Sequence, residues 1–343
     1  MAIIRLRSSK LKSPVRSNFP RGFFPCIFSF LLVIAALGEN SLADFAGRDT
    51  SVHDPSTLVK CDEEFWLFAT GRGIASRYSA DLKHWETGPP VFPQVPSWTT
   101  NMIPANNGRF WAPDVAYLSN RYVLYYAVSS WGRRNSVIGL ATNLTLNPKD
   151  AAFHWVDKGP VIRTTEQDDY NAIDPAVLQC PDGRMWLAFG SYWSGIKLVE
   201  LNPETGLRIA PESPIHSLAW HESIEASYIY RHGPFYYLFV NWGQCCRGVH
   251  STYNIRIGRS AEVTGPYLDK DGLDMLHDGG TSFLESSGDF IGPGHAGIIA
   301  AKGRQWFSCH FYDGRSQGKP TLGILPLTWD DDGWPKAETN AAN

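Results

Sequence analysis

Cysteine, methionine and long apolar runs are scarce in this sequence. The 343 residues include 6 cysteines and 4 methionines, and no two cysteines have CxxC spacing. Cys26 lies in the N-terminal apolar run, and the five cysteines that follow it are an odd number. This odd count and the missing motif argue against a zinc site of that kind and against a disulfide framework. Beyond the first forty or so residues, no stretch approaches the eighteen apolar residues that a membrane-spanning helix needs.

An excess of charge of one sign is also lacking. There are 31 basic and 34 acidic residues, a net charge of −3, and only 19% of the residues are charged. This balance gives no electrostatic case for a nucleic-acid partner. The 43% hydrophobic content is enough for a sizeable core and argues against disorder. The 31 glycines, 23 prolines and 13% aromatic residues favour strands joined by turns over long helices.

Residues 1–43 have the pattern of a secretory signal. They hold six basic residues and one acidic residue, followed by an apolar run, Phe23–Gly38, that contains Pro25. Ser41-Leu42-Ala43 is a small-x-small pattern, so we expect cleavage after Ala43. An uncleaved anchor is the alternative. After cleavage the chain carries a net charge of −8, and we expect a secreted or periplasmic protein, detached from the membrane, with a neutral or cationic partner.

Five short aromatic or β-branched runs recur along the chain, and each reads as a strand. They are Phe65–Phe68, Tyr122–Tyr126, Met185–Phe189, Phe235–Phe239 and Gln305–Ser308. Most are followed by a second run of the same kind, and no helical pattern of comparable strength is present. The spacing between units is 50 to 70 residues, on the order of the length of one propeller blade.

A polar residue precedes each run at a similar distance, ten to twelve residues before the run's centre. The five are Asp54, Asp114, Asp174, Glu225 and His295. Five sheet units predict an all-β fold, a five-bladed β-propeller, as one catalytic domain over residues 44–343. If each polar residue begins an innermost strand, all five point into one axial funnel. The alternative is ordinary turn chemistry at Asp-Pro and Pro-Asp pairs.

A cluster of carboxylates at such an axis is suited to glycoside hydrolysis. One carboxyl group protonates the leaving oxygen, and another activates water or attacks the sugar carbon. Like charges in a confined site raise one another's pKa, which keeps the acid protonated. Asp54, Asp174 and Glu225 are the members that this chemistry requires. Calcium binding is the chemical rival, although the sequence contains neither an EF-hand loop nor an HExxH motif.

The adjacent cysteines Cys245 and Cys246 leave two readings open. They could form a vicinal disulfide, or they could stay as two reduced or separately buried thiols. The sequence does not decide between these readings.

At the level of ordered motifs, the chain resembles glycoside hydrolase family 43, and most closely its arabinan endo-1,5-α-L-arabinosidases. The resemblance runs from about residue 50 to residue 335. It rests on VHDPS, WAPDV, AIDPAV, GSYWSGI, IEASYIY, CCRGVHSTYNIRIGRS, GPYLDKDG, GPGHAGI and LPLTWDDDGWP. It implies a five-bladed propeller, in agreement with the repeat.

The resemblance also implies roles for the axial residues. Asp54 matches the general base, Glu225 the general acid, and Asp174 the carboxylate that raises the pKa of the acid and orients it. The implied outcome is inversion, which requires about 6.5–9.5 Å between the Asp54 and Glu225 carboxyls. His295 matches a histidine near a bound calcium ion that is coordinated largely through water.

Further residues are expected to contact the sugar. Trp111 is a candidate platform, because an aromatic face covers the apolar side of a furanose, and core packing is its alternative. Trp193 is a candidate for another subsite. His53, Asn171 and Ser191 match polar contacts of the family. For Asp114, a hydrogen bond to backbone at the blade entrance is favoured over catalysis.

The expected substrate is arabinan or arabino-oligosaccharide, cleaved at internal bonds by a monomeric enzyme. One alternative keeps the family and changes the specificity to exo-arabinanase, α-L-arabinofuranosidase or β-xylosidase. Many of the xylosidase relatives carry a second β-sandwich domain, for which this chain leaves no room. A retaining fructan enzyme is less favoured because Ala226, not cysteine, follows Glu225. A lectin-like propeller has no need for three axial acids.

Overall fold

The structure, a computed structural model, describes residues 50–337. These residues belong to the second of two compact units, Asn40–Asn343. The predicted signal at 1–43 and its cleavage site lie outside the described residues. Within residues 50–337, no helix is both long and apolar enough to cross a membrane.

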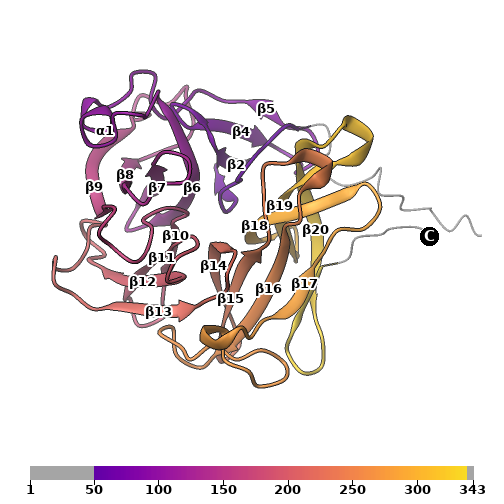
Figure 1. The fold of residues 1–343 in the computed structure, drawn as a ribbon. Helices are drawn as coiled ribbons and strands as arrows, with labels where there is room; N and C mark the ends of the chain where they lie inside the picture. Colours follow the sequence, from indigo (N-terminus) through magenta and orange to yellow (C-terminus); the bar gives the residue numbers. More distant parts are fainter. Residues whose placement is uncertain (1–49, 338–343) are drawn as a thin grey trace, which may run out of the picture. The chain divides into compact units, whose positions relative to one another are not determined.

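Five antiparallel sheets follow one another along the chain (Figure 1). The first contains β1 (Val59–Cys61), β2 (Glu64–Ala69), β4 (Ala75–Ser79) and β5 (Glu86–Thr87). The second contains β3 (Gly71–Arg72), β6 (Arg109–Leu118), β7 (Arg121–Val128), β8 (Ser136–Asn143) and β9 (Val156–Thr164). The third contains β10 (Ala176–Gln179), β11 (Met185–Phe189), β12 (Ile196–Leu201) and β13 (Ile215–Ala219). The fourth contains β14 (Ile224–His232), β15 (Phe235–Trp242), β16 (Asn254–Ser260) and β17 (Thr281–Leu284). The fifth contains β18 (Phe290–Ala301), β19 (Arg304–Asp313), β20 (Lys319–Trp329) and β21 (Pro335–Ala337).

Helical structure in this part of the chain is limited to short turns between strands. These are α1 (Ser97–Met102), η2 (Gly248–His250), η3 (Met275–His277) and η4 (Gly314–Ser316). The sheets succeed one another around a ring, from indigo to yellow in Figure 1. The predicted all-β, five-bladed β-propeller is confirmed.

The core is divided into five apolar clusters, one between each pair of neighbouring blades. Strand β7 shows why its sequence is apolar throughout. Tyr122 and Leu124 pack into the cluster shared with the first blade, whereas Val123 and Tyr125 pack into the cluster shared with the third. Successive side chains point to opposite faces of a strand, so a strand buried on both faces reads as a continuous apolar run.

The ring is closed by the first described residues. The backbone N–H of Val52 donates to the carbonyl of Pro320 at 3.2 Å, and Leu322 donates to Thr50 at 3.0 Å. Val52 and Leu322 also belong to the apolar cluster between the first and fifth blades. This pairing with β20 fixes the chain two residues before Asp54.

Each innermost strand, or the segment that leads into it, carries the same irregularity. Two of its residues oppose a single residue of the next strand, as ladder registers show in blades two, four and five. Backbone hydrogen bonds show the same arrangement in blades one and three. The first residue of every bulge has a positive φ: Asp54 (52°), Ala112 (40°), Asp174 (55°), Ala226 (54°) and His295 (58°).

This repeated bulge corrects the predicted alignment of the five polar residues. Only Asp54, Asp174 and His295 occupy equivalent positions. Glu225 lies one residue before its bulge, and Asp114 lies two residues after the bulge residue Ala112. Neighbouring residues of a strand point to opposite sides, so such offsets send side chains in different directions. The predicted convergence on one funnel therefore holds for four residues and fails for Asp114.

Candidate active site

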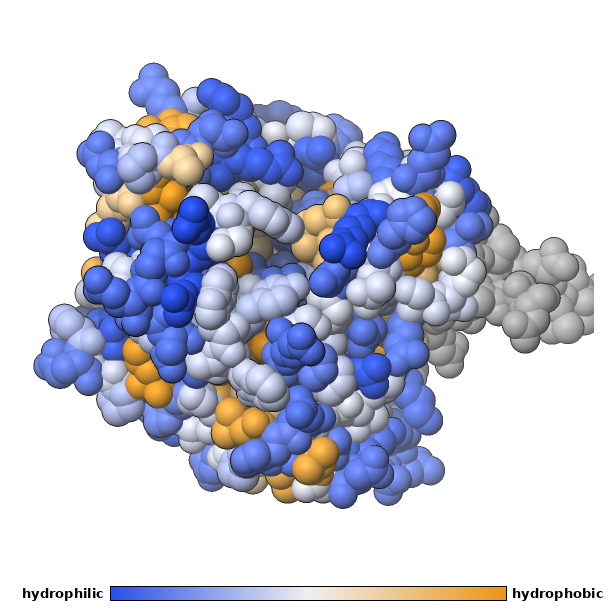
Figure 2. All heavy atoms as spheres, viewed as in Figure 1, coloured by the Kyte–Doolittle hydropathy of each residue, from blue (hydrophilic) through white to orange (hydrophobic). Residues whose placement is uncertain are grey.

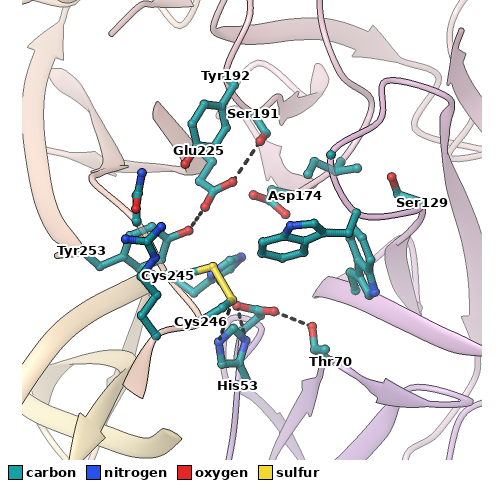
Figure 3. Close-up of a pocket in the computed structure, with 18 of the residues that line it drawn as sticks. His53, Thr70, Ser129, Asp174, Ser191, Tyr192, Glu225, Cys245, Cys246 and Tyr253 are labelled. Carbon is teal, nitrogen blue, oxygen red and sulfur yellow. Dashed lines mark hydrogen bonds and ion pairs between the residues drawn. A yellow bond between two sulfur atoms is a disulfide. The ribbon is translucent and has the colours of Figure 1, made fainter. Parts of the chain in front are cut away.

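A cavity of about 990 Å³ opens where the bulged segments of the five blades meet. Asp54, Asp174, Glu225 and His295 all line it. Figure 3 labels Asp174 and Glu225 among the residues of the cavity wall. In Figure 2 the face viewed is hollowed near its centre, and residues of intermediate hydropathy, drawn nearly white, form part of the rim. The bulges explain this arrangement, because a β-bulge bends the strand and redirects its side chains.

Asp54 is surrounded by hydrogen-bond donors. Its Oδ1 lies 2.8 Å from Nδ1 of His53 and 3.1 Å from Nδ1 of His295. The hydroxyl of Thr70 donates to its Oδ2 at 2.5 Å. Burial alone would raise the pKa of this carboxyl, but the charges and hydrogen bonds of the two histidines outweigh it and hold the pKa well below its usual range. Asp54 is therefore an ionised acceptor at neutral pH.

Glu225 is equally buried but has neutral donors. Tyr253 donates its hydroxyl to Oε1, and Ser191 donates to Oε2 at 2.9 Å. Burial raises the pKa of Glu225, and these two hydrogen bonds offset the rise only in part. Glu225 is thus disposed to keep its proton at a pH where Asp54 has lost its own.

Asp174 is hydrogen-bonded to β14, the strand that carries Glu225. Its Oδ2 accepts a hydrogen bond of 3.1 Å from the backbone N–H of Ala226, the residue after Glu225. Burial raises the pKa of Asp174 to about 8, with His295 opposing the rise and the charges of Glu225 and Asp54 adding to it. The arrangement couples the protonation of Asp174 to that of Glu225, because two like charges in one site disfavour each other.

Asp114 is held away from the cavity by the backbone of two other blades. Its Oδ1 accepts from the N–H of Thr57, and its Oδ2 accepts from the N–H of Val177, each at 2.9 Å. Both acceptor oxygens are engaged in tying the first and third blades to the second. This position agrees with the structural role expected for Asp114.

His295 has one ring nitrogen without a partner. Its backbone N–H donates to Oδ1 of Asn241 at 3.1 Å, and its Nδ1 faces Asp54. The buried Nε2 makes no hydrogen bond within the described structure. Burial alone would lower the pKa of His295, but the charge of Asp54 raises it to about 9. A cation at Nε2 would require the neutral imidazole, so protonation and metal binding compete for this nitrogen.

Tryptophan side chains form part of the cavity wall. Trp111 is half-buried, and its ring centroid lies 6.5 Å from that of Trp131, whose side chain is 75% exposed. Trp193 is 39% exposed, and the guanidinium of Arg134 lies 5.5 Å from the centroid of its ring. Aromatic surface that remains accessible inside a cavity is available to a sugar ring. Trp111 and Trp193 both line the cavity, and their contacts with a sugar remain predictions.

The three predicted polar contacts also line the cavity, but each already has a protein partner. His53 uses Nδ1 toward Asp54 and Nε2 toward the hydroxyl of Tyr312, at 2.9 Å. Asn171 accepts a hydrogen bond of 2.7 Å from Ser136. Ser191 donates to Glu225. Their contacts with a sugar remain predictions.

Several residues that bind the axial groups were missed in the sequence. Thr70, Asn241 and His310 occupy the second strand of their blades or its end, opposite the residue that precedes the bulge. All three bond to bulge residues: Thr70 and the Nδ1 of His310 contact Asp54, and Asn241 contacts His295. The sequence feature that could have identified them is a polar residue at the end of, or within, an otherwise apolar run.

Cys245 and Cys246 form a disulfide in the cavity wall. This observation decides between the two readings that the sequence left open. The other cysteines of the described region, Cys61, Cys180 and Cys309, are buried free thiols.

Comparison with known proteins identifies the family. Residues 49–335 match the Glycosyl hydrolases family 43. The extracellular exo-α-(1→5)-L-arabinofuranosidase ArbA of Cellvibrio japonicus is 38% identical over 85% of this chain and 87% of its own length. The extracellular endo-α-(1→5)-L-arabinanase 1 of Bacillus subtilis is 37% identical over 89% of this chain and 93% of its own.

A solved structure extends the likeness to three dimensions. The α-L-arabinanase of Cellvibrio cellulosa, in complex with arabinohexaose, superposes with a TM-score of 0.80 at 37% identity, covering 84% of this chain and 95% of that one. The family match over residues 49–335 spans all five blades. The chain is therefore a glycosidase and belongs to glycosyl hydrolase family 43.

Proposed function

We propose that this chain is an exported, inverting glycosidase that hydrolyses internal α-1,5-L-arabinofuranosidic bonds of arabinan. The observation that carries the proposal is the pairing, in one cavity, of a carboxyl with a depressed pKa and a carboxyl with a raised pKa. Both are contributed by bulged segments, Asp54 from the first blade and Glu225 from the fourth. A base and an acid that hold opposite protonation states are what glycoside hydrolysis requires.

On the base side, Asp54 accepts a proton from water. His53, His295 and Thr70 orient its carboxylate and keep it ionised. The water attacks the anomeric carbon on the face opposite the leaving group, which inverts the configuration. The carboxyl separation of about 6.5–9.5 Å that this step needs remains a prediction.

On the acid side, Glu225 donates its proton to the glycosidic oxygen as the bond to the anomeric carbon breaks. Ser191 and Tyr253 hold its two oxygens. Asp174 binds the next backbone N–H and, when ionised, disfavours loss of the Glu225 proton. This is the tuning role predicted for Asp174.

Arabinan as the substrate class is supported by the relatives, which are named for acting on α-1,5-linked arabinan or arabinofuranosides. The two similar enzymes differ in mode, one exo and one endo, at nearly equal identity. Cleavage of internal bonds is supported by a cavity at the upper end of the range for small-ligand pockets, with tryptophans beyond the carboxyl cluster. Exo action is the second candidate, because ArbA is an exo enzyme.

Calcium beside His295 remains a proposal with a limited fit. Calcium prefers six to eight oxygen ligands, whereas the free atom on His295 is a single nitrogen, Nε2. Water would have to supply most of the coordination. Nitrogen and oxygen atoms of His53, Asp54 and His310 also lie within 4.8 Å of one another, but hydrogen bonds already join these groups. When bound, the cation would supply positive charge near Asp54.

Export and a monomeric state complete the proposal. Both relatives are named extracellular, in agreement with the predicted signal at 1–43. We expect the mature chain to act on neutral plant polysaccharide, with neither nucleic acid nor membrane as a partner.

A time course on linear, debranched arabinan tests this function, with the products separated by size. A ladder of mixed oligomers at early times is expected from internal cleavage. A single short product from the start would replace endo by exo action within the same mechanism. If the protein left arabinan intact but hydrolysed arabinoxylan or aryl glycosides, the arabinan assignment would fail.

The variant Glu225→Gln tests the acid role, because it keeps the shape of the side chain and removes the proton that Glu225 would donate. We expect kcat on arabinan to fall about 10²- to 10⁴-fold. On an aryl arabinofuranoside with a good leaving group, kcat should fall less, because the leaving group needs little protonation to depart. An equal loss on both substrates would remove Glu225 from the acid role.

A further inference from the structure

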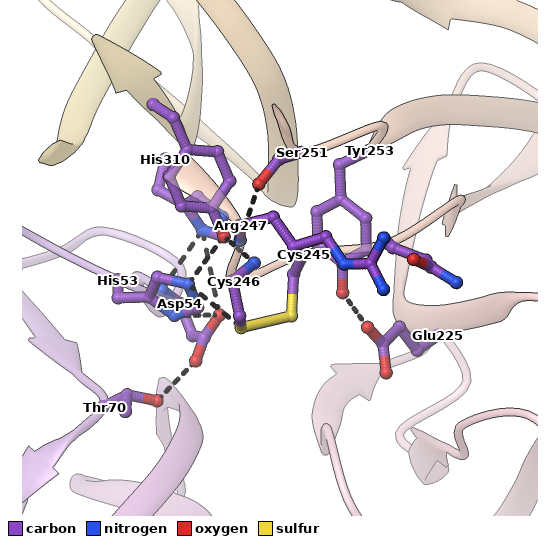
Figure 4. The surroundings of a disulfide bond; sticks show 12 residues. His53, Asp54, Thr70, Glu225, Cys245, Cys246, Arg247, Ser251, Tyr253 and His310 are labelled. Carbon is purple, nitrogen blue, oxygen red and sulfur yellow. Dashed lines mark hydrogen bonds and ion pairs between the residues drawn. A yellow bond between two sulfur atoms is a disulfide. The ribbon is translucent and has the colours of Figure 1, made fainter. Parts of the chain in front are cut away.

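The disulfide Cys245–Cys246 lies against the partner of the catalytic base. Both cysteines line the cavity, and Cys246 is exposed within it (Figure 4). The Sγ of Cys246 is 3.7 Å from Nε2 of His53. None of the roles assigned above uses this pair, which stands beside His53 and Asp54 in space although about 190 residues separate them in sequence.

A directed series of hydrogen bonds links the disulfide to Asp54. The backbone N–H of Cys246 donates to the hydroxyl of Tyr312 at 2.7 Å. The same hydroxyl lies 2.9 Å from Nε2 of His53, whose Nδ1 lies 2.8 Å from Oδ1 of Asp54. Tyr312 accepts from Cys246 and therefore has its proton free to donate to Nε2. With Tyr312 donating, a neutral His53 carries its proton on Nδ1. A protonated His53 carries a proton on Nδ1 as well, so an N–H is directed at Asp54 in both states.

Tyr312 is suited to this donor role. Burial raises its pKa to about 12, so the hydroxyl keeps its proton throughout the neutral range. A second-layer hydrogen bond of this type fixes the tautomer and the ring orientation of a histidine. The ring of His53 also stacks on that of His310, with centroids 4.3 Å apart. The backbone N–H of Cys246 therefore contributes to the alignment of His53 with Asp54 by fixing the orientation of the Tyr312 hydroxyl.

The disulfide fixes the direction of the N–H of Cys246. A bond between adjacent cysteines closes an eight-membered ring that contains the peptide bond between them, and the N–H of Cys246 belongs to this peptide. The φ of Cys246 is +67°, a left-handed conformation that residues other than glycine seldom adopt without a constraint. Once the ring opens, the peptide is free to rotate away from Tyr312.

Reduction would also add a competing donor. A disulfide sulfur carries no proton, so it cannot donate to Nε2 of His53. A thiol at the same 3.7 Å distance carries a proton and is a weak donor. It would compete with the Tyr312 hydroxyl for Nε2 and weaken the alignment of His53.

We propose that the vicinal disulfide Cys245–Cys246 is a positioning element of the catalytic base, acting on Asp54 through Tyr312 and His53. This role rests on the proposed function of Asp54 as the base. If the disulfide has this role, the active enzyme contains the oxidised pair. The disulfide should then affect kcat rather than substrate affinity.

The test is reversible reduction of the folded, full-length enzyme. Dithiothreitol transfers two electrons and two protons to the pair and becomes its own cyclic disulfide. Alkylation of an aliquot with iodoacetamide, followed by mass spectrometry, should find two labelled thiols at Cys245 and Cys246. We expect kcat on debranched arabinan to fall about three- to tenfold, the range for one lost positioning hydrogen bond, with KM within about twofold. Reoxidation should restore kcat.

Two variants make the readout specific. The double variant Cys245→Ser/Cys246→Ser cannot form the bond, so it should show the reduced kcat from the start and no response to dithiothreitol. Tyr312→Phe removes the connecting hydroxyl, so reduction should change its kcat by less than about twofold. A structural role alone would not make the effect of reduction depend on Tyr312.

Three outcomes would overturn the proposal. The first is a reduced enzyme with two labelled thiols and an unchanged kcat. The second is a rise in KM alone, which would assign the sulfurs to sugar contact. The third is a loss of circular dichroism together with activity, which would assign the pair to stability. Activity of the untreated enzyme on arabinan tests the proposed function separately, so the two failures are distinguishable.

Discussion

At the scale of single residues, the charge of the hydrogen-bond donors moves the pKa values of two carboxyl groups apart. Asp54 and Glu225 are both buried, so desolvation acts on them in the same direction. The difference is that His53 and His295 can carry positive charge, whereas Ser191 and Tyr253 are neutral hydroxyls. A cationic donor stabilises the carboxylate more strongly than a neutral one does. Two groups of the same chemical type thus acquire the opposite protonation states that the proposed roles of base and acid require.

The tuning role of Asp174 gives a pH prediction. Asp174→Asn replaces a carboxyl group that becomes negatively charged near and above its pKa of about 8, and it keeps an oxygen for the N–H of Ala226. Because an ionised Asp174 disfavours the charged form of Glu225, its removal should lower the pKa of Glu225. The acid would then lose its proton at a lower pH, so the alkaline limb of kcat/KM should move to lower pH. A pH–rate profile of the two enzymes checks this, and an unmoved alkaline limb would show that Asp174 does not tune Glu225.

At the scale of elements, the repeated bulge determines which side chains enter the cavity. Every blade places a non-glycine residue at positive φ where its inner strand reaches the cavity. Three of the five, Asp54, Asp174 and His295, line the cavity. Sparsely populated backbone conformations persist where the surrounding structure over-determines them, and they gather at functional sites. The bulge converts a regular strand into one that presents a carboxyl group at its end.

Asp114 offers a test of how the blades are joined. Asp114→Ala leaves the partly buried N–H of Thr57 and the buried N–H of Val177 without an acceptor. Each unsatisfied group costs about 1–3 kcal/mol, so we expect the free energy of unfolding to fall by about 2–5 kcal/mol. The folded variant should keep its kcat, because Asp114 does not line the cavity. Denaturant unfolding and steady-state kinetics together measure both effects.

Asp114→Asn is the matched control for this prediction. Its one amide oxygen can satisfy a single N–H, so its loss of stability should lie between those of wild type and Asp114→Ala. A large loss of kcat in a stable Asp114→Asn enzyme would instead place Asp114 in the catalytic machinery.

At the scale of the whole ring, closure depends on a short pairing between residues 50–52 and β20. Val52→Pro removes the N–H that donates to Pro320, whereas Val52→Ala keeps it and trims the same buried side chain. We expect the proline variant to be less stable than the alanine variant by about 1–3 kcal/mol, through the lost hydrogen bond and the unsatisfied carbonyl. Midpoints of urea unfolding at equal slopes check the difference. Equal stabilities would mean that the apolar cluster alone closes the ring.

Much of the fold was predictable because its signals are local. The apolar run Tyr122–Tyr126 is buried on both faces, and five such runs at a steady spacing indicate five blades. Asp54, Asp174 and Glu225 stood out because each occupies a recognisable motif, and all three line the cavity. Their catalytic roles rest on the resemblance and on the chemistry of the site.

What the sequence by itself determined is the architecture and the composition of the site: five two-sided strand units and the acids they carry. The tertiary structure alone decided which polar residues meet. A one-residue bulge, invisible in the apolar pattern, turns Glu225 inward and leaves Asp114 between blades. Ring closure brings Asp54 to His310 and His53 to Tyr312, and the packing of the fourth blade against the fifth brings Cys246 to Tyr312. The reason is physical: strand periodicity is a property of neighbouring residues, whereas side-chain direction at a bulge and contacts across a closed ring depend on the whole chain.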